Sequence, residues 1–233
     1  MVLKKMTDFQ AVGNLRWTKA THQTRSAATL ERLLDSAEVL LLEKSFGDLP
    51  IADIAQRAGY SVGAVYSRFR DKDSLLRCLE ERFVDEVHAT TDAVLDPTEW
   101  QGATLVEVAS EVVSFMVRIH RERLGILREM LSRAHVDAIT GERIERAIQH
   151  VCDRLVVLVG RFPAQIGHPD PVAGVPFAFR LIMGVLKEAI LFRGPGAHGV
   201  PDSDDELAAE LTRAFLGYLA VDSPDSPATP SES

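Results

Sequence analysis

The chain has 233 residues, of which 46% are hydrophobic and 26% are charged. This is the balance of a soluble globular protein with one large domain or two small ones, and it excludes a mostly disordered, collagen-like or coiled-coil chain. The two cysteines, Cys78 and Cys152, form no disulfide framework or zinc pattern, and a reducing cytoplasm fits them best. Charges interrupt every apolar stretch before it reaches the length of a membrane span, and no signal core follows Lys4 and Lys5. We therefore expect a cytoplasmic protein.

The net charge of −8 is distributed unevenly along the chain. Residues 1–72 hold 11 Lys and Arg against 8 Asp and Glu, a net +3, whereas residues 73–233 hold 15 against 26, a net −11. This asymmetry is expected when one end of a protein meets a polyanion such as nucleic acid. Residues 1–22 show no sustained period, and we interpret them as a flexible basic arm.

Hydrophobic periodicity predicts helices along almost the whole chain and no sustained strand. The first helix begins at Thr24 and stops near Gly47, and the fourth opens at Asp73 or Ser74. The last is introduced by the capping sequence that starts at Ser203. Residues 223–233 are rich in Pro, Ser and Asp, and we expect them to be disordered. The predicted helices span residues 24–47, 51–59, 62–69, 73–94, 104–120, 121–134, 141–162, 171–193 and 204–220.

Residues 51–69 have the form of a helix-turn-helix, with two short helices joined by a turn that contains Gly59. In this motif the second helix enters the major groove of DNA. The helical period predicts three inward residues, Val62, Val65 and Phe69. On period alone, an ordinary helical hairpin with a solvated face is an equally good interpretation. The residues expected to project away from the interior are Ser61, Gly63, Ala64, Ser67 and Arg68.

Four stretches carry a more specific signal: QTRSAATLERLLDSA (23–37), IADIAQRAG (51–59), SVGAVYSRF (61–69) and KDSLL (72–76). Together they closely resemble the DNA-binding domain of the tetracycline-repressor (TetR) family. The resemblance implies an all-α fold, with a three-helix helix-turn-helix domain at 23–72 and a larger helical bundle for ligand binding and dimerisation at 73–222. It also implies a homodimeric repressor that a small molecule releases from a palindromic operator.

The resemblance assigns DNA contacts residue by residue. It places Val62, Gly63 and Ala64 against base edges, and it places Thr29 close to the DNA backbone. It implies phosphate contacts for residues near the end of the recognition helix and for Lys72. The full set of expected DNA-binding residues is Thr29, Ser61, Val62, Gly63, Ala64, Tyr66, Ser67, Arg68 and Lys72.

Two positions depart from the family pattern. Pro50 stands where many relatives have a threonine that caps the second helix, and Ala52 has no polar group to read a base. The tip of the recognition helix also lacks the bidentate donors and acceptors of direct readout. We therefore expect specificity from thymine-methyl contacts, backbone and DNA shape. The basic arm is either a minor-groove contact or a solvated tail.

The helical body is expected to hold an effector cavity between the apolar faces of residues 104–120, 141–162 and 171–183. His120 is a polar group on an apolar face, so it is either a satisfied core histidine or an anchor for a ligand. The apolar faces indicate a largely apolar or aromatic effector. The expected ligand-binding residues are Met116, His120, Phe162, Phe177 and Met183.

Residues 171–193 are too apolar for a one-sided surface helix. Together with the last helix, they fit the four-helix dimer interface that the resemblance assigns. The alternative is a buried central helix. The expected interface residues are Ala178, Gly184, Leu211 and Phe215.

We therefore expect a DNA-binding regulator whose partners are double-stranded DNA, a small effector and a second copy of the chain. The sequence GPGAHG at 194–199 follows a helix instead of a strand, and HExxH, GxSxG and P-loop motifs are missing, so no enzyme, cofactor or metal site is predicted. The alternative is a helical protein-interaction module without operator recognition, which the net charge and the apolar recognition tip suggest.

Overall fold

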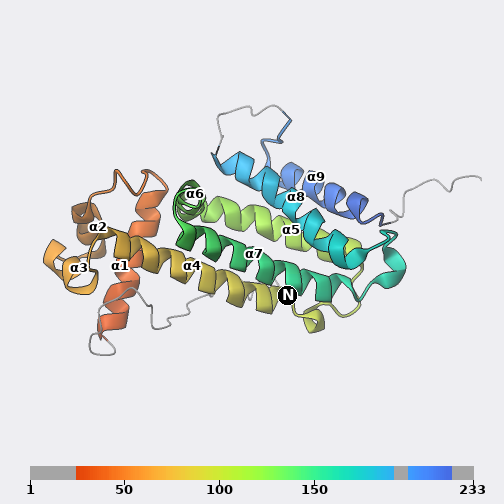
Figure 1. The fold of residues 1–233 in the computed structure, drawn as a ribbon, viewed down its shortest axis with the longest axis horizontal. Helices are drawn as coiled ribbons and strands as arrows, with labels where there is room; N and C mark the ends of the chain where they lie inside the picture. Colours follow the sequence, from red (N-terminus) through yellow and green to blue (C-terminus); the bar gives the residue numbers. More distant parts are fainter. Residues whose placement is uncertain (1–24, 192–198, 222–233) are drawn as a thin grey trace, which may run out of the picture. The chain divides into compact units, whose positions relative to one another are not determined.

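The computed structural model describes residues 25–191 and 199–221, and within these ranges every regular element is a helix (Figure 1). This confirms the expected all-α class. The expected basic arm at 1–22 and tail at 223–233 lie outside the described residues. The helices are α1 (Arg25–Leu41), α2 (Ile51–Ala58), α3 (Val62–Arg68), α4 (Lys72–Val94), α5 (Leu105–Glu122), α6 (Leu124–Arg133), α7 (Ala138–Val159), α8 (Pro171–Leu191) and α9 (Asp204–Tyr218), with 3-10 turns η2 (Pro97–Trp100) and η3 (Pro163–Gln165).

The first helix ends at Leu41, earlier than the sequence predicted. The next positions on its apolar stripe would be Lys44 and Ser45, both of which are exposed in the structure. A turn brings Phe46 and Leu49 inward instead, with 5% and 0% of their surfaces exposed. The prediction failed because the apolar residues after Leu41 follow a turn and not a helical period.

Two compact units share the chain, and each is built from separate stretches of sequence. The first unit takes residues up to Val94 and His120–Val151, and the second takes Leu95–Ile119 and the chain from Cys152 onward. Helices α5 and α7 therefore each contribute to both units. This grouping is distinct from the expected functional boundary between 72 and 73, which stays a prediction.

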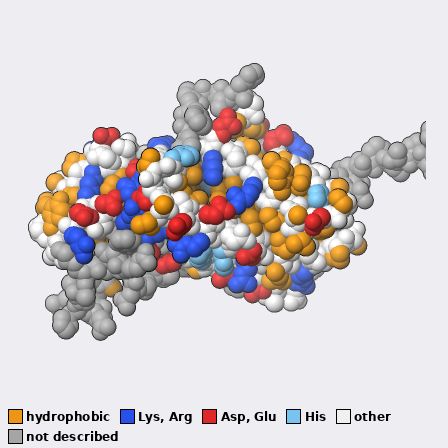
Figure 2. Space-filling view, viewed as in Figure 1, with side chains coloured by type: hydrophobic (Ala, Val, Ile, Leu, Met, Phe, Trp, Pro, Cys, Tyr) orange, Lys and Arg blue, Asp and Glu red, His pale blue; other side chains and the backbone are white. Residues whose placement is uncertain are grey.

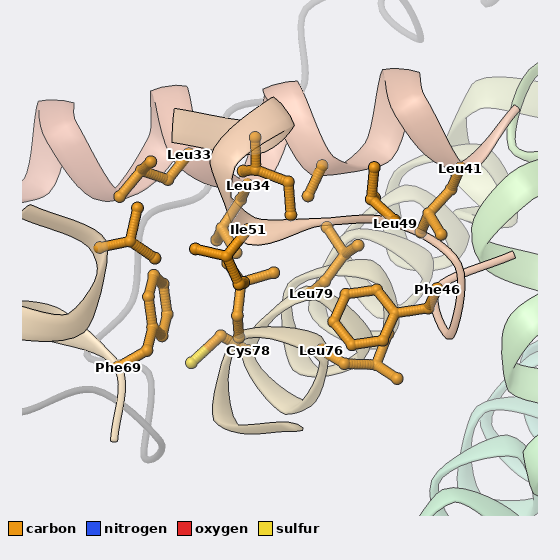
Figure 3. Close-up of a cluster of buried hydrophobic side chains, with 14 of the residues drawn as sticks. Leu33, Leu34, Leu41, Phe46, Leu49, Ile51, Phe69, Leu76, Cys78 and Leu79 are labelled. Carbon is orange, nitrogen blue, oxygen red and sulfur yellow. The ribbon is translucent and has the colours of Figure 1, made fainter. Parts of the chain in front are cut away.

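The core of the first unit joins α1 to α4 into one apolar cluster (Figure 3). Leu33 and Leu34 of α1 are fully buried, as are Leu76 of α4 and Phe69 just after α3. Each such side chain contributes about 1.5–3 kcal/mol by leaving water. The helix-turn-helix is therefore held on a continuous core. Further labelled members of the cluster are Leu41, Phe46, Leu49, Ile51, Cys78 and Leu79.

Buried ion pairs also join α1 to α4. The guanidinium of Arg82 on α4 bonds with three carboxylates of α1, and only 6% of its side chain is exposed. The carboxylates recur at three- and four-residue steps, which places them on one face of the helix. The partners and their distances from Arg82 are Glu31 at 3.1 Å, Asp35 at 2.7 Å and Glu38 at 2.7 Å.

Helix α6 lies against the C-terminal end of α1. A Cβ atom on Gly125 would lie 2.6 Å from the carbonyl carbon of Leu41, so only glycine fits this crossing. Glu129 on the same helix accepts a hydrogen bond of 3.1 Å from the backbone N–H of Phe46. Nearby, the guanidinium of Arg123 pairs with Glu38 and with Glu86, the latter at 2.6 Å. Together α4 and α6 fix the position of α1.

Candidate nucleic-acid interface

The turn between α2 and α3 has the geometry that the sequence predicted. Gly59 follows α2 in the left-handed conformation, with φ 76° and ψ 31°. The next N–H, that of Tyr60, donates to the carbonyl oxygen of Ala55 at 2.8 Å, which closes the C-terminal turn of α2. At the other end, Pro50 occupies the N-cap of α2 and makes no side-chain capping bond. The missing threonine cap is therefore not replaced.

The tip of the recognition helix α3 is capped and exposed. The Oγ atom of Ser61 accepts a hydrogen bond from the N–H of Ala64 at 3.2 Å. Val65 and Phe69 are buried, as predicted, but 40% of the surface of Val62 is exposed. The inward position that periodicity assigned to Val62 is wrong, because the first turn of α3 extends beyond the core. Val62 thus lies on the outside, as the resemblance implied.

One continuous face of α3 is open to solvent. Val62, Gly63, Tyr66 and Ser67 are all exposed, at the spacing that places residues on one side of a helix. The hydroxyl of Ser67 donates to the carbonyl oxygen of Ala64 at 2.8 Å, and its lone pairs stay accessible. The face combines a methyl-bearing tip with hydroxyl groups one turn further on, which matches the chemistry of a DNA groove and its phosphates. Arg68 and Ala64 flank this face and are partly buried.

Lys72 has a structural role in addition to its expected contact with phosphate. Its Nζ atom donates to the carbonyl oxygen of Gly47 at 3.0 Å and lies 4.9 Å from the ring centroid of Phe46. These contacts hold the turn that follows α1. Thr29 lies on α1 and is partly buried. The DNA contacts of both residues stay predictions.

Helix α4 begins one residue earlier than expected, because the residue before it supplies the cap. The Oδ1 atom of Asp71 accepts hydrogen bonds from the hydroxyl and the N–H of Ser74, at 2.6 Å and 2.7 Å. These bonds lower the pKa of Asp71, the hydroxyl bond most strongly. An ionised Asp71 also interacts favourably with the positive N-terminal end of the α4 dipole.

A second buried charge cluster, which the sequence did not predict, lies between α4, α6 and α7. Glu80 is fully buried, and Arg143 lies 2.8 Å from its carboxylate. The hydroxyl of Thr140 donates to Glu80 at 3.0 Å, and Arg133 and Arg77 lie within 4 Å. Burial raises the pKa of Glu80 despite these partners. Apart from Arg77, its partners lie more than fifty residues away in sequence, so no local pattern could reveal the cluster.

The second unit holds a small cavity between α5, α7, α8 and α9. Its volume is about 20 Å³, and every side chain that lines it is apolar. Of the five expected ligand-binding residues, Met116 alone lines this cavity. His120 belongs to the first unit, and Phe162 and Met183 are partly buried elsewhere in the second. Half of Phe177 is exposed, and its ring centroid lies 5.0 Å from that of Tyr218.

The four expected interface residues divide between the inside and the outside of the second unit. Ala178, Leu211 and Phe215 are buried within the chain itself. Gly184 is exposed, and a Cβ atom there would meet nothing within 4 Å. On the face drawn in Figure 2, hydrophobic side chains gather over the part of this unit that contains α8.

The comparisons with known proteins agree with the helix-turn-helix geometry. The family model for bacterial regulatory proteins of the tetR family matches residues 33–79. Residues 33–79 thus carry the DNA-binding domain of the TetR family. Over 64 residues it is 36% identical to an uncharacterized HTH-type transcriptional regulator, YwcC, of Bacillus subtilis. This match covers 28% of the chain and 29% of that relative's length.

Solved structures share the fold over most of the chain. A putative TetR-family regulator from Mesorhizobium loti superimposes with a TM-score of 0.68 at 20% identity, over 85% of this chain and 98% of that one. Salmonella enterica GusR gives 0.62 at 18% identity, over 86% and 100%. The family match identifies a DNA-binding domain of a bacterial regulatory protein at residues 33–79, as the sequence predicted. Among the described residues, no helix is long and apolar enough to cross a membrane.

Proposed function

We propose that this TetR-family chain is a dimeric repressor that binds a palindromic operator through α3 and leaves it when a small, largely apolar effector binds. The observation that carries the proposal is the exposed face of α3. Val62, Gly63, Tyr66 and Ser67 form that face on a helix whose other side is locked into the core. A protein-interaction module would have no need for this rigid, narrow and hydroxyl-bearing helix face.

The exposed face suits shape-based recognition more than direct readout. Val62 can pack against a thymine methyl group, whereas no Asn, Gln or Arg lies at the tip to form a bidentate contact. Two copies of α3 related by a two-fold axis must enter successive major grooves on one side of the duplex. The half-sites of the operator should therefore lie about one helical turn, roughly 34–36 Å, apart.

The experiment that tests this function selects the bound duplex from random DNA and measures its Kd between about 50 and 200 mM salt. Arg68→Ala removes an expected phosphate contact, so it should weaken binding to all sequences and reduce the salt slope by about 1. Tyr66→Ala should also weaken binding to all sequences. Arg128→Ala, an exposed change on α6, is the control. Failure to select any duplex would support the protein-interaction alternative.

We infer that the dimer forms through the exposed apolar side of α8 and the end of α9. In Figure 1 these two helices run side by side. Phe177 and Leu181 are 51% and 45% exposed one helical turn apart, and Tyr218 of α9 stacks on Phe177. Exposed apolar patches of this kind mark interfaces in soluble proteins. Gly184 continues the same stripe and permits close approach of a second backbone.

Effector binding requires the second unit to open. Its cavity of about 20 Å³ holds little more than a water molecule. Ligand sites usually measure ~300–1,000 Å³, so the effector must favour a more open conformation that binds DNA poorly.

The apolar lining also predicts how effector strength varies with structure. In a homologous series of effectors, each added methylene group should lower the concentration that releases DNA about fourfold, because burying a CH₂ group is worth ~0.8 kcal/mol. Fluorescence anisotropy of a labelled operator measures this concentration. Equal potency along the series would contradict an apolar site.

A further inference from the structure

A groove on the first unit lies where α1 and α2 pack together. It has a volume of about 560 Å³. None of the expected DNA-binding residues lines it, and it is separate from the apolar cavity of the second unit. The lining residues are Arg32, Asp35, Ser36 and Val39 of α1 and Arg57 and Ala58 of α2.

Ser36 places an unpartnered hydroxyl at this groove. The residue is 93% buried, since 7% of its surface is exposed, and it makes no hydrogen bond with the described part of the chain. Two other helical hydroxyls do bond to the backbone of their own helix. Ser132 donates to the carbonyl oxygen of Arg128 at 2.8 Å, and Thr212 donates to that of Ala208 at 2.7 Å. The Ser36 hydroxyl is therefore available to an occupant of the groove as a donor or an acceptor.

Two guanidinium groups and one carboxylate line the same groove, and the carboxylate is paired with an arginine outside the lining. Arg32 and Arg57 are exposed, and neither forms an ion pair within residues 25–191 or 199–221. The only acidic residue in the lining, Asp35, lies 2.7 Å from Arg82 and belongs to the buried ion pairs between α1 and α4. The planar fork of arginine matches the oxygens of carboxylate and phosphate groups.

The rest of the lining is apolar. Val39 is 38% exposed, and Ala58 forms part of the floor. This wall suits the carbon skeleton of a small organic acid, whose charged end would meet the two guanidiniums and the Ser36 hydroxyl.

We propose that the groove between α1 and α2 is an oxyanion-binding site that takes the carboxylate or phosphate group of a small organic molecule. The site is independent of operator recognition and of the apolar effector cavity. The first unit would thus bind a small-molecule ligand separately from the second unit.

Calorimetric titration of the full chain at constant ionic strength tests the site with two probes, benzoate and inorganic phosphate. Saturable binding of either probe that weakens about tenfold in Arg32→Gln and in Arg57→Gln supports the proposal, because each variant removes charge-assisted hydrogen bonds. Tighter binding of benzoate assigns a carboxylate with an apolar body, and tighter binding of phosphate assigns a phosphate group. The control Arg128→Gln changes an exposed arginine of the same unit and should bind both probes as the parent does.

Two results would overturn the proposal. One is the lack of saturable binding by both probes, or binding that survives both arginine substitutions. The other concerns DNA, which also carries phosphate groups. If Arg32→Gln and Arg57→Gln lower operator affinity and its salt slope without any probe present, the groove is part of the DNA contact and not a separate site. Arg32 and Arg57 are both exposed, so the arginine variants should fold normally.

Discussion

Gly59 shows how one residue can fix the angle between α2 and α3. Its φ of 76° is a conformation that L side chains rarely adopt, and a Cβ atom there would meet nothing within 4 Å. Gly59→Ala should therefore destabilise the chain by about 1–2 kcal/mol through backbone strain alone. Gly59→Asn should cost less, because asparagine tolerates this region. Urea unfolding of the two variants checks the order, and equal losses would point to a clash instead of strain.

Asp137 makes stability depend on pH at the acid end. Burial disfavours its charge, but hydrogen bonds from Arg77 and Arg133 outweigh burial and lower the pKa of Asp137 from 3.8 to about 2. A folded-state pKa below the unfolded value adds stability that is fully present above about pH 4 and is lost as the pH falls towards 2. Asp137→Asn should remove this loss, which we expect to be about 1–2 kcal/mol.

Unfolding in urea at pH 4 and at pH 2.5 measures the effect of Asp137. Asparagine can still cap α7, where the Asp137 Oδ1 atom now accepts from the N–H of Ile139 at 3.0 Å. The raised pKa values of Glu80 and Glu86 act with the opposite sign and in a higher pH window. If Asp137→Asn loses as much unfolding free energy between pH 4 and pH 2.5 as the parent does, the loss belongs to other carboxylates.

At this scale, the sequence predicted residues whose role is local. Gly59 and Ser61 could be assigned because a left-handed turn and a helix N-cap each depend on neighbours within four residues. Val62 could not, because it lies one turn before the buried Val65 and periodicity treats the two alike. Only the extent of the surrounding core decides that Val62 is outside.

The crossing of α1 and α6 depends on Gly125. Its Cβ position lies 2.6 Å from the backbone of Leu41, which cannot move without moving α1. Gly125→Ala should separate the helices and cost about 1–3 kcal/mol. It should also weaken operator binding, because α1 shares a core with the helix-turn-helix and would move relative to it. Gly63→Ala is the stability control, since the atom nearest to its Cβ position is Ser61 Oγ at 3.7 Å and alanine favours a helix. If urea unfolding gives Gly125→Ala and Gly63→Ala the same change in unfolding free energy, the tight crossing is contradicted.

The sequence predicted helices better than the contacts between them. The acidic residues Glu31, Asp35 and Glu38 follow a helical period and are visible as a charged stripe on α1. Their shared partner, Arg82, lies more than forty residues away and looks like any other charge on α4. Buried ion pairs of this kind need a particular packing of two helices, which the period of either helix alone does not contain.

For the whole molecule, the dimer can be tested at Gly184. Gly184→Arg places a long cation on the exposed stripe of α8, where open space lets the single chain accept it. In the dimer that cation would be buried without a partner, which costs several kcal/mol. We expect a folded monomer in equilibrium sedimentation, with unchanged circular dichroism. A stable Gly184→Arg dimer would place the interface elsewhere.

The grouping of the helices into two units could not be predicted from the sequence. Periodicity gave each helix its apolar face, and these faces suffice for an all-α class. However, the two effector residues expected from α5, Met116 and His120, belong to different units. Residues four apart on one helix share a face, but a change of packing partner along that helix leaves no local signal.

The first unit has a consequence for the order in which the chain folds during its synthesis. One side of its core closes only when residues 120–151 join α1–α4, since Gly125 and Glu129 contact the end of α1 and Ile126 and Met130 belong to the same apolar cluster. Translation adds ~5–20 residues per second, so residues 120–151 become available several seconds after α3 has left the ribosome. During that interval the apolar surfaces of α1 and α4 that α6 later covers stay open to water. A chaperone that binds short apolar segments would therefore meet this protein first at its DNA-binding end.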